Sequence, residues 1–398
     1  MQRILFVGIN PNRDDHLAII AKIIGKVEVY VINGIGNNSK KIINTQVFSW
    51  NEFISVNHIV KKLKPHSIVF FDIESYNEVL LNIYAKNQNI STYILDHGVR
   101  SFRNALEREE KETPNILPGS KVPLLEKVKN RLFILISLKF ISKDDRLFFR
   151  KYIFLRKNHS SFGARRRLKD LRRLPSEYIV FSPSNLAYWQ ELDQFDKDQH
   201  KVSVIGFPAF DKIFKSQSTI SKRVSALYVD SPFHEFNLFG WTYESKKEFV
   251  TQIILLFEEL NIPLCIKLHP KSDEKLYTEL KEDHTFQLVN GSSTEYLYLA
   301  EIIVGFDSSL LYPIISFSGT ISFSINFHPK VLNRNLSQDF LDQGVSIAVN
   351  SFDELKQGLH NKNSILKSQE ENKKAFIKKY LYKADGNSSN RLVEVLIK

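Results

Sequence analysis

The best-supported candidate for chemistry is a histidine that precedes a proline at the end of an apolar run. Residues 262–266 are apolar, Lys267, His269 and Pro270 follow, and an amphipathic stretch begins soon after. Where a strand ends and a helix begins, free backbone N–H groups and the positive end of the helix dipole favour an anion. His269 can add a hydrogen bond, and the proline fixes the turn. The pattern predicts a phosphate-binding turn; the alternative is a histidine that only caps it.

A second junction of the same kind follows one strand–helix–strand step later. The apolar run 302–304 stops at Gly305, and Ser308 and Ser309 precede the next helical pattern. Serine at a helix start commonly caps backbone N–H groups, so simple capping is one interpretation. The other is that both hydroxyls bind the same phosphate as His269. Ser231, after the first strand of the second half, is a further candidate for contact with that phosphate.

The first half of the chain offers two candidate general bases. Asp96 and His97 end a strand pattern and precede Gly98 and Arg100. A carboxylate or an imidazole at a strand end can take the proton of an attacking hydroxyl, so either residue could serve. The alternative is structural, with Asp96 capping the turn and His97 packed against it.

Cofactor and metal signatures are missing from the sequence. Gly8 and Asn10 form the turn after the first strand and are expected to line a cleft, but no Gly-x-Gly-x-x-Gly accompanies them. A nicotinamide-dependent dehydrogenase is therefore disfavoured. The single cysteine, Cys265, excludes a disulfide scaffold and a cysteine-based zinc site. No convincing Asp-x-Asp motif stands in a suitable loop, so we expect neither a metal ion nor a cofactor.

Strands must position these residues, and both halves alternate short β-branched runs with amphipathic stretches. This alternation is typical of parallel sheets flanked by helices, which bind ligands beyond the carboxyl ends of their strands. A length of 398 residues favours two domains. We therefore predict an α/β protein with two doubly wound, Rossmann-like domains that face a cleft. The predicted strands comprise residues 3–8, 27–32, 67–71, 92–95, 178–181, 202–205, 225–229, 263–267, 302–305 and 320–325.

The predicted domains are an N-terminal domain, residues 1–217, and a C-terminal domain, residues 218–385. Residues 386–398 are expected to form a helix that crosses back to the first domain. The N-terminal domain also contains a basic helical insertion, residues 121–173, that interrupts the alternation.

This insertion concentrates much of the net charge of +11. Its Lys and Arg residues alternate with large apolar ones, which suits an anionic membrane surface; core-packed helices with solvated basic faces are the alternative. Nucleic acid is not an expected partner, because no recognition module accompanies the charge. With neither a secretion signal nor ~18 consecutive apolar residues, the expected location is cytoplasmic, and the insertion leaves open a peripheral position at the inner face of the cell membrane.

The two strand-end motifs resemble those of a known group of enzymes. Lys267-Leu268-His269-Pro270, followed by Gly305-Phe306-Asp307-Ser308-Ser309, is similar to the His-Pro and Ser-Ser motifs of GT-B glycosyltransferases that build bacterial surface polysaccharides. The group includes sialyltransferases, Kdo (3-deoxy-manno-octulosonic acid) transferases and teichoic acid glycerophosphotransferases. Residues 204–211 look like its Gly-x-Pro-x-x-Asp element, and residues 385–389 look like its C-terminal tail.

The resemblance implies a metal-independent glycosyltransferase that acts on a glycan or lipid-linked acceptor, with a CMP-linked acidic sugar as the preferred donor. Residues 1–217 would then be the acceptor domain, with Gly8, Asn10, Gly98 and Arg100 on the acceptor side, and residues 218–385 would be the nucleotide-donor domain. His269 would contact the donor phosphate and help the leaving group depart, Ser308 and Ser309 would bind phosphate or a donor carboxylate, and Lys267 would supply charge. The alternatives are, in order, a CDP-polyol glycerophosphotransferase of the teichoic acid type, a UDP-sugar 2-epimerase, and an assembly subunit without catalytic activity.

Overall fold

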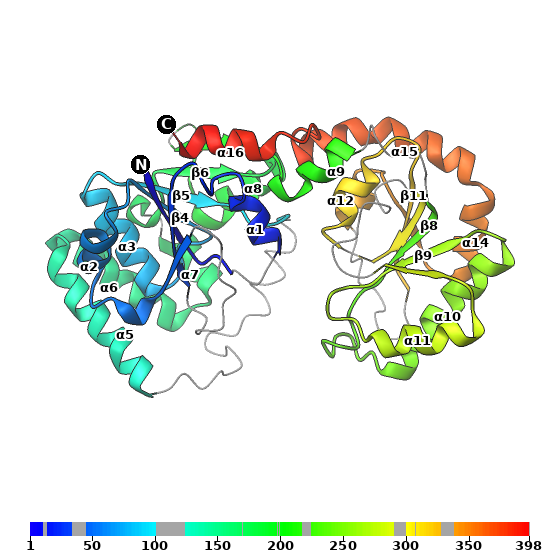
Figure 1. Cartoon of the computed structure of the whole chain (residues 1–398), viewed down its shortest axis with the longest axis horizontal. Helices are drawn as coiled ribbons and strands as arrows, with labels where there is room; N and C mark the ends of the chain where they lie inside the picture. The colour runs from blue at the N-terminus through cyan, green and yellow to red at the C-terminus, as the bar shows by residue number, and fades with distance from the viewer. Residues whose placement is uncertain are drawn as a thin grey trace. The chain divides into compact units, whose positions relative to one another are not determined.

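The computed structural model describes residues 1–10, 14–33, 45–100, 124–168, 170–196, 198, 200–216, 224–289, 300–306, 308–327 and 338–397. It consists of two compact units: unit 1 is Met1–Ala209 with Asn387–Lys398, and unit 2 is Phe210–Gly386. Each unit is a parallel sheet flanked by helices (Figure 1), which confirms the α/β class and the two Rossmann-like domains. Asp307, residues 121–123 of the insertion and the predicted boundary at residues 217 and 218 lie outside the described residues.

The sheet of unit 1 has the strand order β3-β2-β1-β4-β5-β6-β7, and every pairing in it is parallel. Because the strand order reverses between β1 and β4, a ligand crevice is expected beyond the ends of these two strands. The strands are β1 (Arg3–Val7), β2 (Glu28–Asn33), β3 (Thr45–Ser49), β4 (Ser67–Phe70), β5 (Ser91–Leu95), β6 (Glu177–Val180) and β7 (Lys201–Val204).

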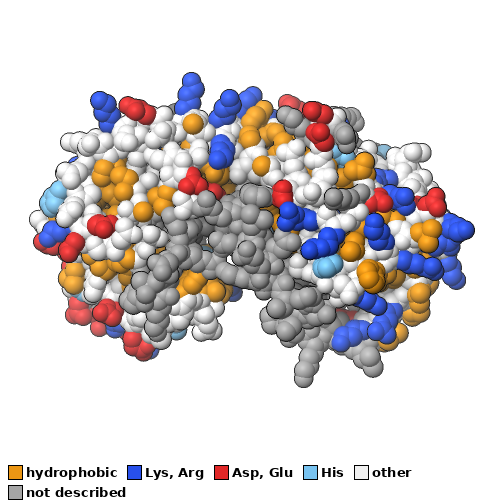
Figure 2. Space-filling view, turned by 180° about the vertical axis from the view of Figure 1, so that it is seen from behind, with side chains coloured by type: hydrophobic (Ala, Val, Ile, Leu, Met, Phe, Trp, Pro, Cys, Tyr) orange, Lys and Arg blue, Asp and Glu red, His pale blue; other side chains and the backbone are white. Residues whose placement is uncertain are grey.

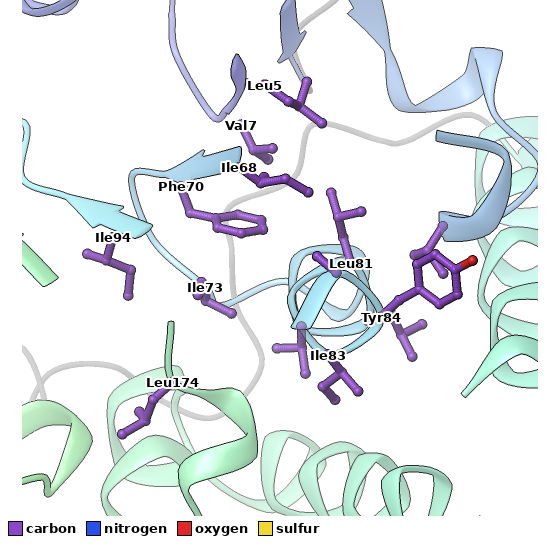
Figure 3. Close-up of a cluster of buried hydrophobic side chains, with 14 of the residues drawn as sticks. Leu5, Val7, Ile68, Phe70, Ile73, Leu81, Ile83, Tyr84, Ile94 and Leu174 are labelled. Atoms are coloured by element: carbon purple, nitrogen blue, oxygen red, sulfur yellow. The ribbon is translucent and has the colours of Figure 1, made fainter. Parts of the chain in front are cut away.

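The core of unit 1 lies between this sheet and the helix α3 (Tyr76–Asn87). Figure 3 shows Val7, Ile68 and Phe70 from the strands beside Leu81 from α3. Ser75 and Glu78 form a capping box that begins α3, an arrangement that satisfies backbone N–H groups at the helix start. The other helices of this unit are α1 (Asp14–Ile20), α2 (Val56–Leu63), α5 (Leu124–Ser137), α6 (Lys143–Asn158), α7 (Ser161–Leu168), α8 (Pro183–Asp193) and α16 (Ser388–Leu396).

Residues 124–168 form helices between β5 and β6, and two of these helices cover α3 from outside. α3 contacts both α5 and α6, and it is buried over most of its circumference, as expected for a helix enclosed between layers. Phe133 of α5 and Phe148, Phe149 and Tyr152 of α6 are buried in the same core. The apolar residues of the basic segment are therefore divided between a core-facing side and an exposed side.

The sheet of unit 2 has the order β10-β9-β8-β11-β12-β13, again with parallel pairs, and reverses between β8 and β11. Its strands are β8 (Val224–Val229), β9 (Leu264–Lys267), β10 (Gln287–Val289), β11 (Ala300–Gly305), β12 (Ile321–Ile325) and β13 (Ile347–Val349). Its helices are α9 (Asp211–Ser216), α10 (Tyr243–Glu259), α11 (Glu274–Asp283), α12 (Leu311–Ile315), α13 (Gln338–Asp342), α14 (Phe352–His360) and α15 (Lys362–Phe376).

The units divide between Ala209 and Phe210, earlier than the boundary expected from the sequence. The reason is the packing of α9, which the sequence analysis assigned to the first domain. Phe214 on this helix contacts Phe317 of unit 2, with ring centroids 6.1 Å apart.

The C-terminal helix α16 belongs to unit 1. Arg391 on this helix donates a hydrogen bond to the carbonyl of Ile205 at 2.8 Å. Gly206 has a φ of 87°, and any side chain there would collide with Ser388. Gly206 of the Gly-x-Pro element and Ser388 of the C-terminal tail are therefore in close contact.

The short strands β3, β10 and β13 were not predicted from the sequence. Each lies at or next to a sheet edge and is only partly buried, so none needs the continuous apolar run that marks a central parallel strand. In the described part of the chain, no helix has both the length and the hydrophobicity to cross a membrane.

Candidate active site

Lys267 and Gly305 lie level with each other at the carboxyl edge of the sheet in unit 2. Val229, the last residue of β8, pairs with Lys267 on one side and with Gly305 on the other. Because neighbouring strands are ~4.8 Å apart, the Cα atoms of Lys267 and Gly305 are separated by roughly 10 Å. His269 and Ser308 thus follow strand ends that flank β8, beside the point where the strand order reverses. Open α/β sheets bind their ligands at this position.

The ring of His269 has a defined tautomer. The backbone N–H of Lys271 donates to Nδ1 of His269 at 3.1 Å, so Nδ1 must present a lone pair and the neutral ring carries its proton on Nε2. Burial lowers the pKa of His269, which favours this neutral form. No described residue forms a hydrogen bond with Nε2, so this N–H group can donate to a ligand.

The backbone N–H groups of this turn are not free, contrary to the expectation from the sequence. The N–H groups of His269 and Asp273 donate to Ser272 Oγ and Glu235 Oε1, at 3.2 and 2.8 Å. The N–H of Ser272 donates to the carbonyl of His269. The helix α11 begins only after Asp273, whose carboxylate caps it. Since the protein's own carboxylates occupy the helix start, anion binding at this turn depends on side chains.

A buried ionic network holds the turn in place. Lys246 on α10 is buried and donates to Asp230 Oδ2 at 2.9 Å and to Glu235 Oε1 at 2.7 Å. Ser272 Oγ donates to Asp230 Oδ2 at 2.5 Å. Burial raises the pKa of Asp230, against the effect of Lys246. Lys246 was not predicted from the sequence, because no local motif marks a lysine on the buried side of a helix.

Lys267 is a buried cation without a carboxylate partner among the described residues. Its side chain donates to the carbonyl of Leu268 at 2.9 Å. Burial lowers the pKa of Lys267 because the charged form loses its hydration. A buried charge is costly unless it is paired, so an anionic ligand would stabilise the protonated lysine.

Of the two serines, only Ser308 has a side-chain hydrogen bond to the helix start within the described residues, and that bond is long. The helix α12 has Leu310 at its N-cap and no side-chain hydrogen bond there. Ser308 accepts from the N–H of Leu310 at 3.4 Å, which is long for a hydrogen bond, and Ser309 is exposed. Within the described residues, no hydrogen bond joins His269 to either serine. Their convergence on one anion therefore stays a prediction.

The other predicted site residues of unit 2 are Ser231, Pro270 and Gly305. Ser231 is buried just after β8, and Pro270 is exposed in the turn that follows His269. A side chain at Gly305 would lie 3.3 Å from the carbonyl oxygen of Val229. Close packing of two strands is thus sufficient to explain this glycine.

In unit 1, Asp96 is a buried carboxylate with four hydrogen-bond donors. Oδ1 accepts from Trp189 Nε1 at 2.7 Å and from Arg100 Nε at 3.2 Å, and Oδ2 accepts from the Phe181 N–H at 2.9 Å and from Asn185 Nδ2 at 2.8 Å. Burial raises the pKa of Asp96, while Arg100 and these donors act in the opposite direction. A carboxylate so enclosed joins β5 to β6 and α8 and is poorly placed to accept a proton from a substrate.

His97 is half-buried beside two other rings. It stacks on Phe71, which follows β4, at 5.2 Å between ring centroids, and contacts His16 of α1 edge-on at 5.5 Å. Arg100 Nη2 lies 3.4 Å from His97 Nδ1. Because a guanidinium can only donate, this nitrogen presents a lone pair. The sequence analysis did not identify His16, which lies far from the Asp-His-Gly stretch in the chain.

The glycines of the acceptor side differ in their roles. Gly8 has a φ of 90°, which explains a glycine at the end of β1. The N–H of Asn10 donates to His16 Nδ1 at 3.1 Å, so this turn fixes the His16 ring. Gly98 has ordinary backbone angles, and a Cβ there would meet no atom within 4 Å. Neither the backbone conformation nor crowding by neighbouring atoms therefore requires a glycine at position 98.

Solved structures share this arrangement of two sheets. The wall teichoic acid polymerase TagF superposes with a TM-score of 0.55 and 12% sequence identity over 99% of this chain and 87% of that one. MurG from Acinetobacter baumannii superposes with a TM-score of 0.50 and 10% identity over 100% and 99%. At these identities the likeness shows the fold alone, which is that of the GT-B glycosyltransferases.

A family model identifies the chain more closely. Residues 21–326 match the alpha-2,8-polysialyltransferase (POLYST) family. This match covers most of the chain, and the protein belongs to that family and is a glycosyltransferase. A search of curated protein sequences gives no match.

Proposed function

We propose that this protein transfers an acidic sugar of the sialic acid or Kdo type from a CMP-linked donor to the end of a bacterial surface glycan, without a metal ion. The observation that carries the proposal is the pair of donors at the end of β9. Among the described residues, no carboxylate pairs with the buried Lys267 ammonium group, and no group forms a hydrogen bond with the Nε2–H of His269. Membership of a polysialyltransferase family supports the choice of sugar.

On the donor side, departure of the nucleotide leaves negative charge on a phosphate oxygen. Hydrogen-bond donors that are already in place at such an oxygen stabilise the transition state, and the loss of one typically costs ~100- to 1000-fold in rate. We assign this role to His269 Nε2–H, with Lys267 supplying positive charge. Ser308, Ser309 and Ser231, at the neighbouring strand ends, would bind the remaining phosphate oxygens or the carboxylate of the sugar.

On the acceptor side, His97 is the better of the two candidate bases. Four donors fill the lone-pair sites of the Asp96 carboxylate, so one of them would have to be displaced before it could take a proton. The ring of His97 is half-buried, and its Nδ1 lies 3.4 Å from Arg100 Nη2. Gly98, Gly8 and Asn10 would leave space beside the base for the acceptor sugar.

A second candidate function is transfer of a polyol phosphate from a CDP-linked donor. It is supported by the fold of TagF, one structure of which was obtained with CDPG. The two reactions break different bonds of the donor, but both release CMP, so the donor that is consumed distinguishes them. Incubation with CMP-, CDP- and UDP-linked donors, each with and without EDTA, should give CMP release from the CMP-linked donor alone, and EDTA should not inhibit it. CMP release from a CDP-linked donor would favour the second function, and release of no nucleotide would contradict both.

We further propose that α5 lies on an anionic membrane surface. Leu125, Val128, Leu132 and Leu135 are spaced by three and four residues and are each between 44% and 65% exposed, so they form one apolar stripe along the helix. Lys129 and Arg131 are exposed on the same helix. Figure 2 shows Lys and Arg side chains among hydrophobic ones on the surface of unit 1. An apolar stripe with basic neighbours suits a surface of anionic lipids.

A further inference from the structure

Asp72, at the carboxyl end of β4, is a carboxylate with one oxygen held by the protein and one that is not. Oδ1 accepts from Arg165 Nη1 at 2.7 Å and from the N–H of Ile73 at 2.7 Å. The side chain is 28% exposed, and no described residue forms a hydrogen bond with Oδ2. The carboxylate therefore has a fixed orientation, and its Oδ2 can accept a hydrogen bond from a ligand.

The orientation of Asp72 is set by a buried network from the helical segment. Arg165 on α7 and Arg173 are both buried and both contact the carboxylate of Asp193 at the end of α8. Arg173 also donates to the carbonyl of Ile73 at 2.8 Å. The two arginines thus anchor the backbone and the side chain of the loop after β4. Because these contacts already fix the side chain of Asp72, little rotamer entropy is lost when it binds a ligand.

The location of Asp72 is the acceptor side of unit 1. β4 lies between β1 and β5, next to the reversal of the strand order. The residue before Asp72 is Phe71, whose ring stacks on His97. Since β4 and β5 are paired in parallel up to Phe70 and Ile94, Asp72 and His97 follow neighbouring strand ends. Polar side chains at such ends converge on the ligand crevice of a doubly wound sheet.

We infer that Asp72 is an acceptor-binding residue, whose Oδ2 accepts a hydrogen bond from a hydroxyl group of the terminal acceptor sugar next to the hydroxyl that reacts. This inference rests on the proposed function and extends it. A carboxylate can only accept, so it selects for a ligand that offers hydroxyl or amide donors, as a glycan does. Such a contact orients the sugar beside His97, whereas proton removal stays with His97.

The test is the variant Asp72→Asn in the full-length protein. Its amide oxygen can keep the bonds from Arg165 and Ile73, while its NH2 group replaces Oδ2 and converts an acceptor into a donor. We expect an acceptor KM raised by about 10- to 100-fold, as for the loss of a hydrogen bond to a charged group. Donor KM and nucleotide release without acceptor should stay unchanged, and thermal stability should fall only slightly, because Arg165 keeps its bonds to the carboxylate of Asp193.

The matched control is Glu74→Gln, two residues further along the same loop. Glu74 is also a partly exposed carboxylate that contacts an arginine, Arg156, at 3.4 Å, and its variant should leave the acceptor KM unchanged. An unchanged acceptor KM in Asp72→Asn would overturn the inference, and so would equal effects of the two variants. Loss of acceptor-independent nucleotide release in Asp72→Asn would also overturn it, because Asp72 would then act on the fold or the donor. Failure of the wild type to release nucleotide would instead count against the proposed function.

Discussion

The backbone N–H of Lys271 donates a hydrogen bond to Nδ1 of His269 at 3.1 Å, and this contact decides which ring nitrogen can serve a ligand. A histidine that precedes a proline could in principle present either nitrogen. In this structure Nδ1 is used within the turn, so a donor phosphate can receive a proton or a hydrogen bond only from Nε2.

Substitution of His269 by two different amides tests this assignment. The side-chain NH2 of His269→Gln can reach the position of Nε2, whereas His269→Asn reaches only the position of Nδ1. We expect turnover to fall by ~100-fold or more in His269→Asn and by less in His269→Gln, because only the longer amide can donate to the leaving group. Nucleotide release assays measure the rates. The free energy of unfolding should change by less than about 1 kcal/mol in both variants. Equal turnover in wild type and His269→Asn would place the active site elsewhere.

The pH dependence of donor binding should reveal the buried charge of Lys267. Because burial lowers its pKa, the lysine loses its proton at a lower pH than an exposed lysine does, and donor affinity should fall as the pH rises through that lowered pKa. The free energy of unfolding should change with pH in the opposite direction to donor affinity. Between the lowered pKa and the ordinary value of 10.5 the unfolded chain binds more protons than the folded one, so the free energy of unfolding should increase with pH.

The variant Lys267→Met should remove both effects. It should bind donor weakly at all pH values, and its free energy of unfolding should equal or exceed that of the wild type, because no charge is buried. Donor titrations and denaturant unfolding at a series of pH values provide the measurements. If Lys267→Met keeps wild-type donor affinity, the buried ammonium is not part of the donor site.

Paired variants at the Asp-His-Gly stretch should separate the structural residue from the base. Asp96→Asn leaves buried donors without an acceptor and should cost about 3 kcal/mol of unfolding free energy. His97→Asn should leave stability nearly unchanged and lower kcat by ~100-fold or more, with acceptor-independent release of nucleotide retained. Chemical denaturation and steady-state kinetics give the two readouts. A stable, inactive Asp96→Asn together with an active His97→Asn would reverse the assignment.

The apolar stripe of α5 should determine binding to lipid. Replacing Leu132 and Leu135 together by glutamate should abolish sedimentation with vesicles that contain anionic lipid, since it removes apolar area and adds like charge. Leu255→Glu, on an exposed position of α10 that is 48% accessible, is the control and should bind as the wild type does. Binding should weaken with salt, because screening shortens the reach of the charges. Equal, weak sedimentation of the wild type with neutral and anionic vesicles would argue against a membrane role.

The sequence by itself determined the architecture and the positions of the motifs. Central parallel strands are buried on both faces, so they must be apolar runs, and a polar motif directly after such a run must lie at the carboxyl edge of a sheet. This reasoning located His269, Ser308 and His97 without coordinates. The same reasoning did not predict the edge strand β3, because a half-buried strand needs no continuous apolar run.

Only the tertiary structure decided what the side chains at these edges can do. Asp96 and His97 are neighbours in the chain, yet one is enclosed by four donors and the other is half-buried against Phe71. Asp72 gains its anchor from Arg165, a residue 93 positions further along the chain. Such contacts form only when distant segments fold together, and local patterns of residue type carry no information about them.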